Sequence, residues 1–139
     1  MPDRDEIIGS ARSSFAFLQG RPAEVVDDFW LPTLVYPIGP VTVEVELDRG
    51  DQIVHVLIGR TVNGHRPPGY YRHDGRLMRV QFTDALDGGG EPDRAAARRV
   101  RAVAGTSGPA AMVAQIHEPA AILREMTDRL ADDRRLFTD

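Results

Sequence analysis

The stretch HRPPGYYRHDGR, residues 65–76, holds two histidines, two tyrosines, one aspartate and three arginines. Imidazole and carboxylate groups can ligate a metal or transfer protons, and tyrosine and arginine are side chains that protein interfaces enrich. The turn signals Pro67-Pro68-Gly69 and Asp74-Gly75 lie inside this stretch, and Asn63-Gly64 precedes it. The pattern predicts a surface connection between two strands that is rich in reactive side chains.

His65, His73 and Asp74 are the donor types of a zinc or iron site. The spacing of the two histidines is not that of HExxH, and no regular helix or strand would aim them at one point. We therefore predict no metal site and interpret the three residues as part of a solvated loop.

His55 is a second candidate for proton transfer, because histidine titrates near neutrality. It lies in the apolar run 52–60, and its nearest acidic candidates are Glu44 and Glu46 in the preceding run. One interpretation is a structural cross-strand pair. The alternative is a small-molecule-binding protein or an enzyme that uses a histidine–carboxylate pair in a pocket between sheet and helices.

Composition excludes several chemistries. The chain of 139 residues has no cysteine, and all 17 basic residues are arginine. Disulfides, zinc–thiolate sites, iron–sulfur clusters, lysine Schiff bases and lysine-containing phosphate loops are therefore impossible. No Gly-x-Ser-x-Gly elbow or cofactor fingerprint is present, so no catalytic residue, cofactor or metal ligand is predicted. We favour a binding protein over an enzyme.

Charge and hydropathy indicate where the protein acts. The formal net charge of −4 argues against a nucleic-acid partner. No apolar run approaches the roughly 20 residues of a membrane span, and the first ten residues lack the features of a signal peptide. We expect a soluble, cytoplasmic protein without membrane association. Arginine without lysine favours a bacterium with a high-GC genome.

Hydrophobic periodicity predicts an α+β fold. Residues 2–20 have helical spacing, with Gly20 as the C-cap. In residues 41–47 valine and leucine alternate with Thr42, Glu44 and Glu46, which indicates one buried and one solvent-facing side. Together with the runs 52–60 and 76–82 and a short strand before PIGP, this gives an antiparallel meander of about four strands. Pro37 favours an edge position for the first strand.

The second half of the chain is predicted to be helical. Residues 84–92 form an expected glycine-rich linker between a sheet half, about 1–83, and a helical half, 93–139, within one domain of residues 1–139. We expect one helix over about 92–104, with Arg94, Arg98 and Arg101 on a solvated face. Two more are expected, from Pro109 to His117 and from Pro119 onward.

The segment 21–32 is ambiguous between a loop and a short turn of helix. Its Trp30 is the single tryptophan of the chain. We interpret Trp30 as a partly buried anchor, and the alternative is an exposed contact residue.

Three segments carry a resemblance: SFAFL, LVYPIGPVTVEVELD and AAILREMTDRLADDRRLF. In their order the chain resembles small uncharacterised bacterial α+β proteins, some of which are similar to immunity proteins that neutralise toxins. The resemblance implies a protein partner and assigns no catalytic residue.

The predicted partner-binding residues lie in the connection 65–79 and are Tyr70, Tyr71, Arg72, Arg76 and Arg79. The arginines would complement an acidic patch on a protein partner or on a second copy of the chain. In the alternative interpretation, the tyrosines cover the sheet and the arginines are merely solvated.

Overall fold

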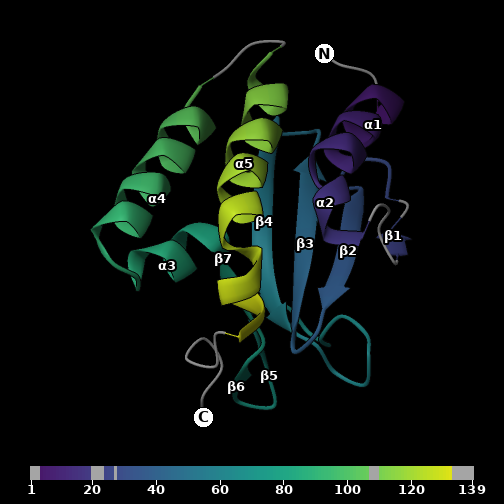
Figure 1. Ribbon diagram of the computed structural model, residues 1–139. Coiled ribbons are helices and arrows are strands. Elements are labelled where there is room, and N and C mark those ends of the chain that lie inside the picture. Colours follow the sequence, from purple (N-terminus) through teal and green to yellow (C-terminus); the bar gives the residue numbers. More distant parts are fainter. Residues whose placement is uncertain (1–3, 20–23, 27, 107–109, 133–139) are drawn as a thin grey trace.

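The computed structural model describes residues 4–19, 24–26, 28–106 and 110–132 (Figure 1). The helices are α1 (Arg4–Ser14), α2 (Ala16–Gln19), α3 (Phe82–Asp87), α4 (Glu91–Ala104) and α5 (Ala111–Asp132). The strands are β1 (Glu24–Val26), β2 (Thr33–Ile38), β3 (Val41–Asp48), β4 (Ile53–Arg60), β5 (Arg72–His73), β6 (Arg76–Leu77) and β7 (Arg79–Gln81).

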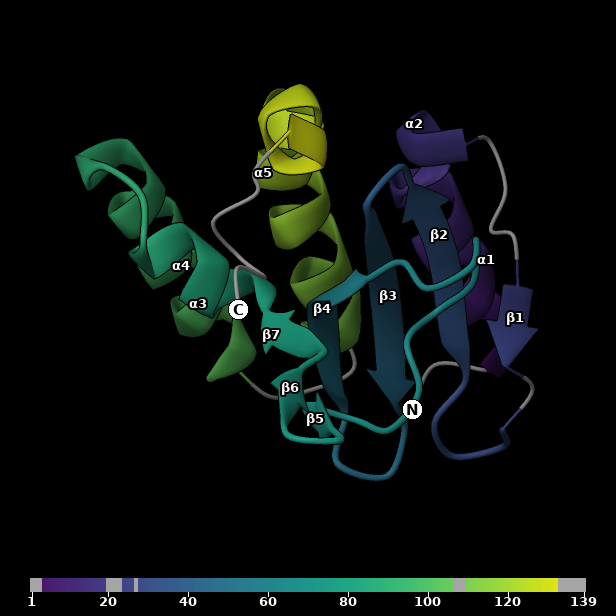
Figure 2. The same ribbon diagram turned by 90° about the horizontal axis from the view of Figure 1, so that it is seen from below.

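Five strands form one antiparallel sheet in the order β1-β2-β3-β4-β7, and β5 pairs with β6 in a separate hairpin. The helices lie on one face of the five-stranded sheet (Figures 1 and 2). The predicted α+β fold with an antiparallel meander is therefore confirmed. The fifth strand, β1, comes from the segment 21–32, for which we expect a loop or a helical turn.

One face of the sheet forms the hydrophobic core with the helices. Val43, Val45 and Leu47 of β3 are fully buried, as their alternation predicts. They pair with Ile58, Val56 and Val54 of β4, which point to the same side. The buried cluster also includes residues of α1, α3, α4 and α5, so all four of these helices share one core with the sheet.

The prediction of a solvent-facing side for Thr42, Glu44 and Glu46 is wrong. Their relative exposures are 0%, 0% and 5%. The reason is the long connection between β4 and β7, which folds back over this second face of the sheet and covers it. The alternation of side chains shows which residues share a face of the sheet, but it does not show which other segment of the chain covers that face.

Two boundaries differ from expectation around β7. The predicted strand 76–82 is divided into β6 and β7, and Phe82 begins α3 with its ring buried against the core. The expected linker 84–92 contains the rest of α3 and the start of α4, and Gly88–Gly90 alone separate the two helices. The predicted helix over about 92–104 corresponds to α4 and is confirmed.

The two helices expected on either side of Pro119 are one helix. α5 runs through Pro119 from Ala111 to Asp132, whereas the predicted start at Pro109 lies outside the described residues. Proline removes one helical N–H and usually breaks a helix. Here four residues at helical spacing form a continuous buried stripe that offsets this cost: Met112, Ile116, Ala120 and Leu123.

In the part of the chain that the structure describes, no helix combines the length and the apolar character needed to cross a bilayer.

The buried hydroxyl of Tyr36 generates a first prediction. Tyr36 is fully buried beside Phe15, and its hydroxyl has no hydrogen-bond partner among the described residues. Burial raises the pKa of Tyr36 to about 12. We expect Tyr36→Phe to raise the free energy of unfolding by about 1 kcal/mol at neutral pH, because an unsatisfied buried polar group is removed.

The pH dependence follows from the raised pKa. Neutral Tyr36 makes its full contribution to the free energy of unfolding below pH 10, which is near the pKa of tyrosine in the unfolded chain. This contribution is lost as the pH rises toward 12. Tyr36→Phe should therefore make the stability less sensitive to pH over this range in denaturant titrations. A loss of stability in Tyr36→Phe at neutral pH would contradict the assignment.

Candidate functional site

A buried ion pair anchors the connection between β4 and β7. Glu44 of β3 is 0% exposed and Arg79 of β7 is 1% exposed. The Arg79 Nε donates to Glu44 Oε2, and Nη2 donates to Glu44 Oε1 at 3.1 Å. This is a bidentate ion pair, in which two N–H donors of the guanidinium bind the two oxygens of the carboxylate.

Arg79 also holds the backbone of the connection. Nη1 donates to the carbonyl oxygens of Gly69 and Tyr70, both at 2.8 Å, and Nη2 donates to that of Pro67 at 2.8 Å. With the two bonds to Glu44, all five guanidinium N–H donors are used. One side chain therefore ties residues 67–70 to the centre of the sheet.

Two further residues complete a charge-balanced cluster. Arg66 Nε lies 2.8 Å from Glu44 Oε1, and the hydroxyl of Tyr70 donates to Glu46 Oε1 at 2.8 Å. The pKa of Tyr70 is raised above its usual value by burial and by the adjacent Glu46 carboxylate. Beneath the connection, Glu44 is therefore paired with two arginines and Glu46 accepts a hydrogen bond from Tyr70, so both buried carboxylates have partners.

Glycines allow the connection to approach the sheet and turn sharply. A Cβ on Gly59 of β4 would lie 3.1 Å from the Pro67 ring, so a side chain there would push the connection outward. Asn63-Gly64 and Asp74-Gly75 both have positive φ at each residue, as two-residue hairpin turns require. These turn positions agree with the sequence signals.

The predicted partner-binding residues divide into two groups. Tyr70 and Tyr71 remain 45% and 39% exposed, with their rings in edge contact at 4.6 Å, and Arg72 and Arg76 are exposed on the β5–β6 hairpin. Gln81 donates to the Tyr71 hydroxyl at 2.7 Å. Arg79 does not belong with them, because its side chain is buried by the bonds that hold the loop. We call the exposed residues 70–76 the tyrosine loop.

A second exposed cluster lies between β1 and β2. Phe29, Trp30 and Leu31 are 60%, 57% and 37% exposed, and we call these three residues the aromatic knob. The expectation of a partly buried Trp30 is therefore wrong, and the alternative of an exposed residue describes the structure.

The aromatic knob is held by its neighbours although it is exposed. Asp28 Oδ1 accepts the backbone N–H groups of Trp30 and Leu31, both at 2.8 Å. Arg49 donates from Nη1 to the Phe29 carbonyl at 2.9 Å, and its guanidinium stacks 4.7 Å from the Phe29 ring centre. The Phe29 and Trp30 rings contact each other edge to face at 4.9 Å. Polar neighbours thus fix the rings at the surface instead of in the core.

The histidines of the sequence analysis lie apart. His65 forms an isolated bridge with Val62, and His73 lies 3.4 Å from exposed Asp74. Among the described residues, no three histidine, aspartate or glutamate side chains are close enough to hold a metal ion. His55 lies directly opposite Glu46 in the β3–β4 register, as one sequence alternative predicts, but the Glu46 carboxylate accepts from Tyr70.

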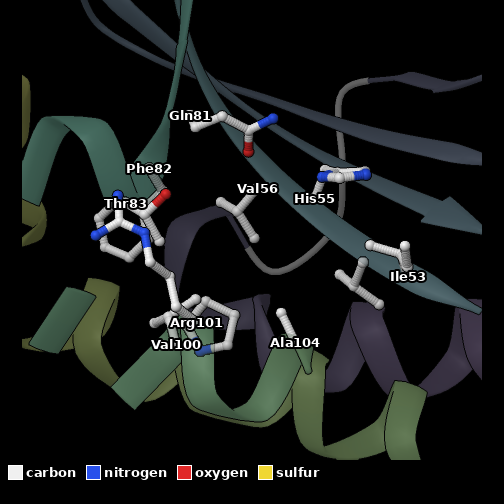
Figure 3. A pocket seen from close by; sticks show the side chains of 11 residues that line it. Ile53, His55, Val56, Gln81, Phe82, Thr83, Val100, Arg101 and Ala104 are labelled. Atoms are coloured by element: carbon white, nitrogen blue, oxygen red, sulfur yellow. The ribbon is translucent and has the colours of Figure 1, made fainter. Parts of the chain in front are cut away.

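A pocket of about 140 Å³ lies at the edge of β4, between the sheet and α4 (Figure 3). His55 is one of its lining residues, but none of the described residues around it is an aspartate or glutamate. The histidine–carboxylate pair of the enzymatic alternative is therefore not assembled in this pocket.

The arginines predicted on a solvated helix face are indeed exposed on α4. Arg94 and Arg98 contact Glu91, and Arg101 contacts Asp87. Arg98 and Arg94 lower the pKa of Glu91, and Arg101 lowers that of Asp87. Exposed pairs of this kind add little to stability, and they leave these arginines already engaged with carboxylates.

Comparison of the chain with protein-family models, with curated proteins and with solved structures gives no match.

The five-donor role of Arg79 generates a second prediction. Lysine has three donors and no planar fork, so Arg79→Lys should lose at least two charge-assisted hydrogen bonds. We expect the free energy of unfolding in urea to fall by about 2–4 kcal/mol. Arg72→Lys, on the exposed hairpin, should change it by less than about 0.5 kcal/mol. Equal effects of the two substitutions would contradict the anchoring role.

Proposed function

We propose that this chain is a protein-binding module whose contact surface comprises the aromatic knob and the tyrosine loop. One observation carries the proposal: every large hydrophobic side chain that is exposed among the described residues lies in one of these two segments. Scattered exposed hydrophobic residues are ordinary, but concentrated ones mark interaction sites. Tryptophan, tyrosine and arginine are also the residues that dominate binding energy at interfaces.

Both segments are pre-organised, which supports binding rather than chance exposure. Asp28 fixes the backbone of the aromatic knob, while the Phe29 ring contacts the Trp30 ring and the Arg49 guanidinium. Glu46 accepts a hydrogen bond from the Tyr70 hydroxyl. Side chains that are already ordered lose less conformational entropy when a partner covers them. An aromatic residue held at the surface by several polar bonds is therefore well suited as a binding anchor.

The strand register brings the two segments toward one side of the molecule. Glu46, which holds Tyr70, pairs with Thr33 at the start of β2. Leu31 lies two residues before Thr33, and the pairing of β2 with β3 continues through Pro32 and Trp30. The Thr33 hydroxyl donates to the Leu31 carbonyl at 3.3 Å, so both segments contact the Thr33–Glu46 pair. A single partner surface could reach both segments.

The charged residues in and around the contact surface indicate which charges the partner should carry. Arg72 and Arg76 are exposed within the tyrosine loop, whereas exposed Asp28 directly precedes the aromatic knob. The partner should therefore present an apolar patch with acidic groups on one side and basic groups on the other. The resemblance to immunity-like proteins makes a toxin domain one such partner class, and a second copy of the chain is the alternative.

The test begins with capture of a partner from the native cell and ends with affinities measured on purified components. We expect Trp30→Ala and the double variant Tyr71→Ala/Arg76→Ala each to weaken binding at least 30-fold, which corresponds to about 2 kcal/mol. Their melting temperatures should remain close to that of the wild type, because the substituted side chains are exposed.

Arg124→Ala provides a matched control for Arg76→Ala, because Arg124 is also exposed but lies on α5, on the other side of the sheet. Sedimentation over a range of concentrations tests the second copy as the partner. The proposal fails if binding survives both surface variants, or if the chain stays monomeric and captures no protein that binds it directly.

A further inference from the structure

The pocket beside β4 exists because β7 is short. β7 has three residues and pairs only with Leu57, Ile58 and Gly59, and after Gln81 the chain turns into α3. The first half of β4, residues 53–56, pairs with β3 on one side but therefore has no described strand beside it on the β7 side. α4 lies across this gap, and the space between them is the pocket (Figure 3).

Gln115 of α5 closes the strand edge next to the pocket. Its side chain is buried; its Oε1 accepts the Val54 N–H at 2.8 Å and its Nε2 donates to the Gln52 carbonyl at 3.1 Å. One carboxamide thus makes the two bonds that a peptide group of a neighbouring strand would make. Because Gln115 already occupies the Val54 N–H and the Gln52 carbonyl, a small molecule suits this site better than an added strand.

The lining of the pocket combines apolar and polar residues. Val54, Val56, Phe82, Val100 and Pro119 supply the apolar walls. Four polar side chains also contribute to the lining: His55, Gln81, Thr83 and Arg101 (Figure 3). Small-molecule sites commonly combine an apolar cavity with a few polar groups that orient the ligand.

The ion pair that Arg101 makes with Asp87 indicates which charge the ligand should carry. Its guanidinium already binds the Asp87 carboxylate at 2.6 and 3.0 Å, so it does not require an anionic ligand. The described lining contains no carboxylate that would require a cationic one. A neutral ligand is the best match to this environment.

We propose that this pocket binds a neutral molecule with one aromatic ring and one hydroxyl or amino group. An apolar cavity of about 150 Å³ is known to hold benzene, and the pocket of about 140 Å³ is close to that size. The ring would lie against Val56 and Phe82, and the polar substituent would face Thr83, which also lines the pocket. This site is separate from the protein-binding surface and does not depend on it.

Phenol is the probe for the test, followed by the backbone amide signals of the full chain in two-dimensional NMR. We expect concentration-dependent shifts centred on Val56, Phe82 and Val100, with saturation at millimolar phenol or below. Benzoate, which carries a charge, and 2-naphthol, which has a second ring, should each bind at least tenfold more weakly than phenol.

Two alanines of α4 offer a matched pair of variants. Ala104 lines the pocket, and Ala102 is exposed on the same helix away from it. Ala104→Phe should place a ring over the pocket and weaken phenol binding at least tenfold, whereas Ala102→Phe should leave it unchanged. The proposal is overturned if 10 mM phenol shifts no pocket amide, if Ala104→Phe binds phenol like the wild type, or if 2-naphthol or benzoate binds as well as phenol.

Discussion

The ion pair between Glu44 and Arg79 is the interaction on which the second face of the sheet depends. A carboxylate in the centre of a sheet, removed from water, is costly unless it is paired and hydrogen-bonded. Arg79 meets this requirement and uses its remaining donors on the backbone carbonyls of residues 67, 69 and 70. The same guanidinium therefore neutralises the buried charge and folds the connection onto the sheet.

This arrangement links a buried polar cluster to exposed aromatic rings. Once Arg79 fixes the backbone at Gly69 and Tyr70, the Tyr70 hydroxyl reaches Glu46 and the Tyr71 hydroxyl reaches Gln81. Both rings stay partly exposed although their hydroxyls are bound and the Arg79 guanidinium lies 5.8 Å from the centre of the Tyr70 ring. The aromatic knob uses the same physical device at the other loop, where Asp28 and Arg49 hold Phe29 and Trp30 from the backbone side.

Local patterns in the sequence predict the fold, whereas contacts over long sequence distances decide the site. The alternation of Val43 and Val45 identifies the core face of β3, and Asn63-Gly64 marks a turn. The burial of Glu44 depends on Arg79, 35 residues away, and no local pattern reports that pairing. Likewise, the hydrophobicity of Trp30 favours burial, and the bonds from Asp28 and Arg49 that keep it at the surface are visible only in three dimensions. Pro119 stays helical because core packing outweighs its local preference.

Hydrogen exchange in the double variant Glu44→Met/Arg79→Met tests most directly whether the ion pair holds the connection. Replacing both charges by apolar side chains of similar length should leave the chain folded, since no fully buried charge is left unpaired. Arg66, which also loses its contact with Glu44, has a side chain that is 28% exposed. We predict that amides of β4 and α5 keep their protection, while those of residues 66–78 exchange at least tenfold faster than in the wild type. Unchanged protection of residues 66–78 in a folded double variant would contradict the account.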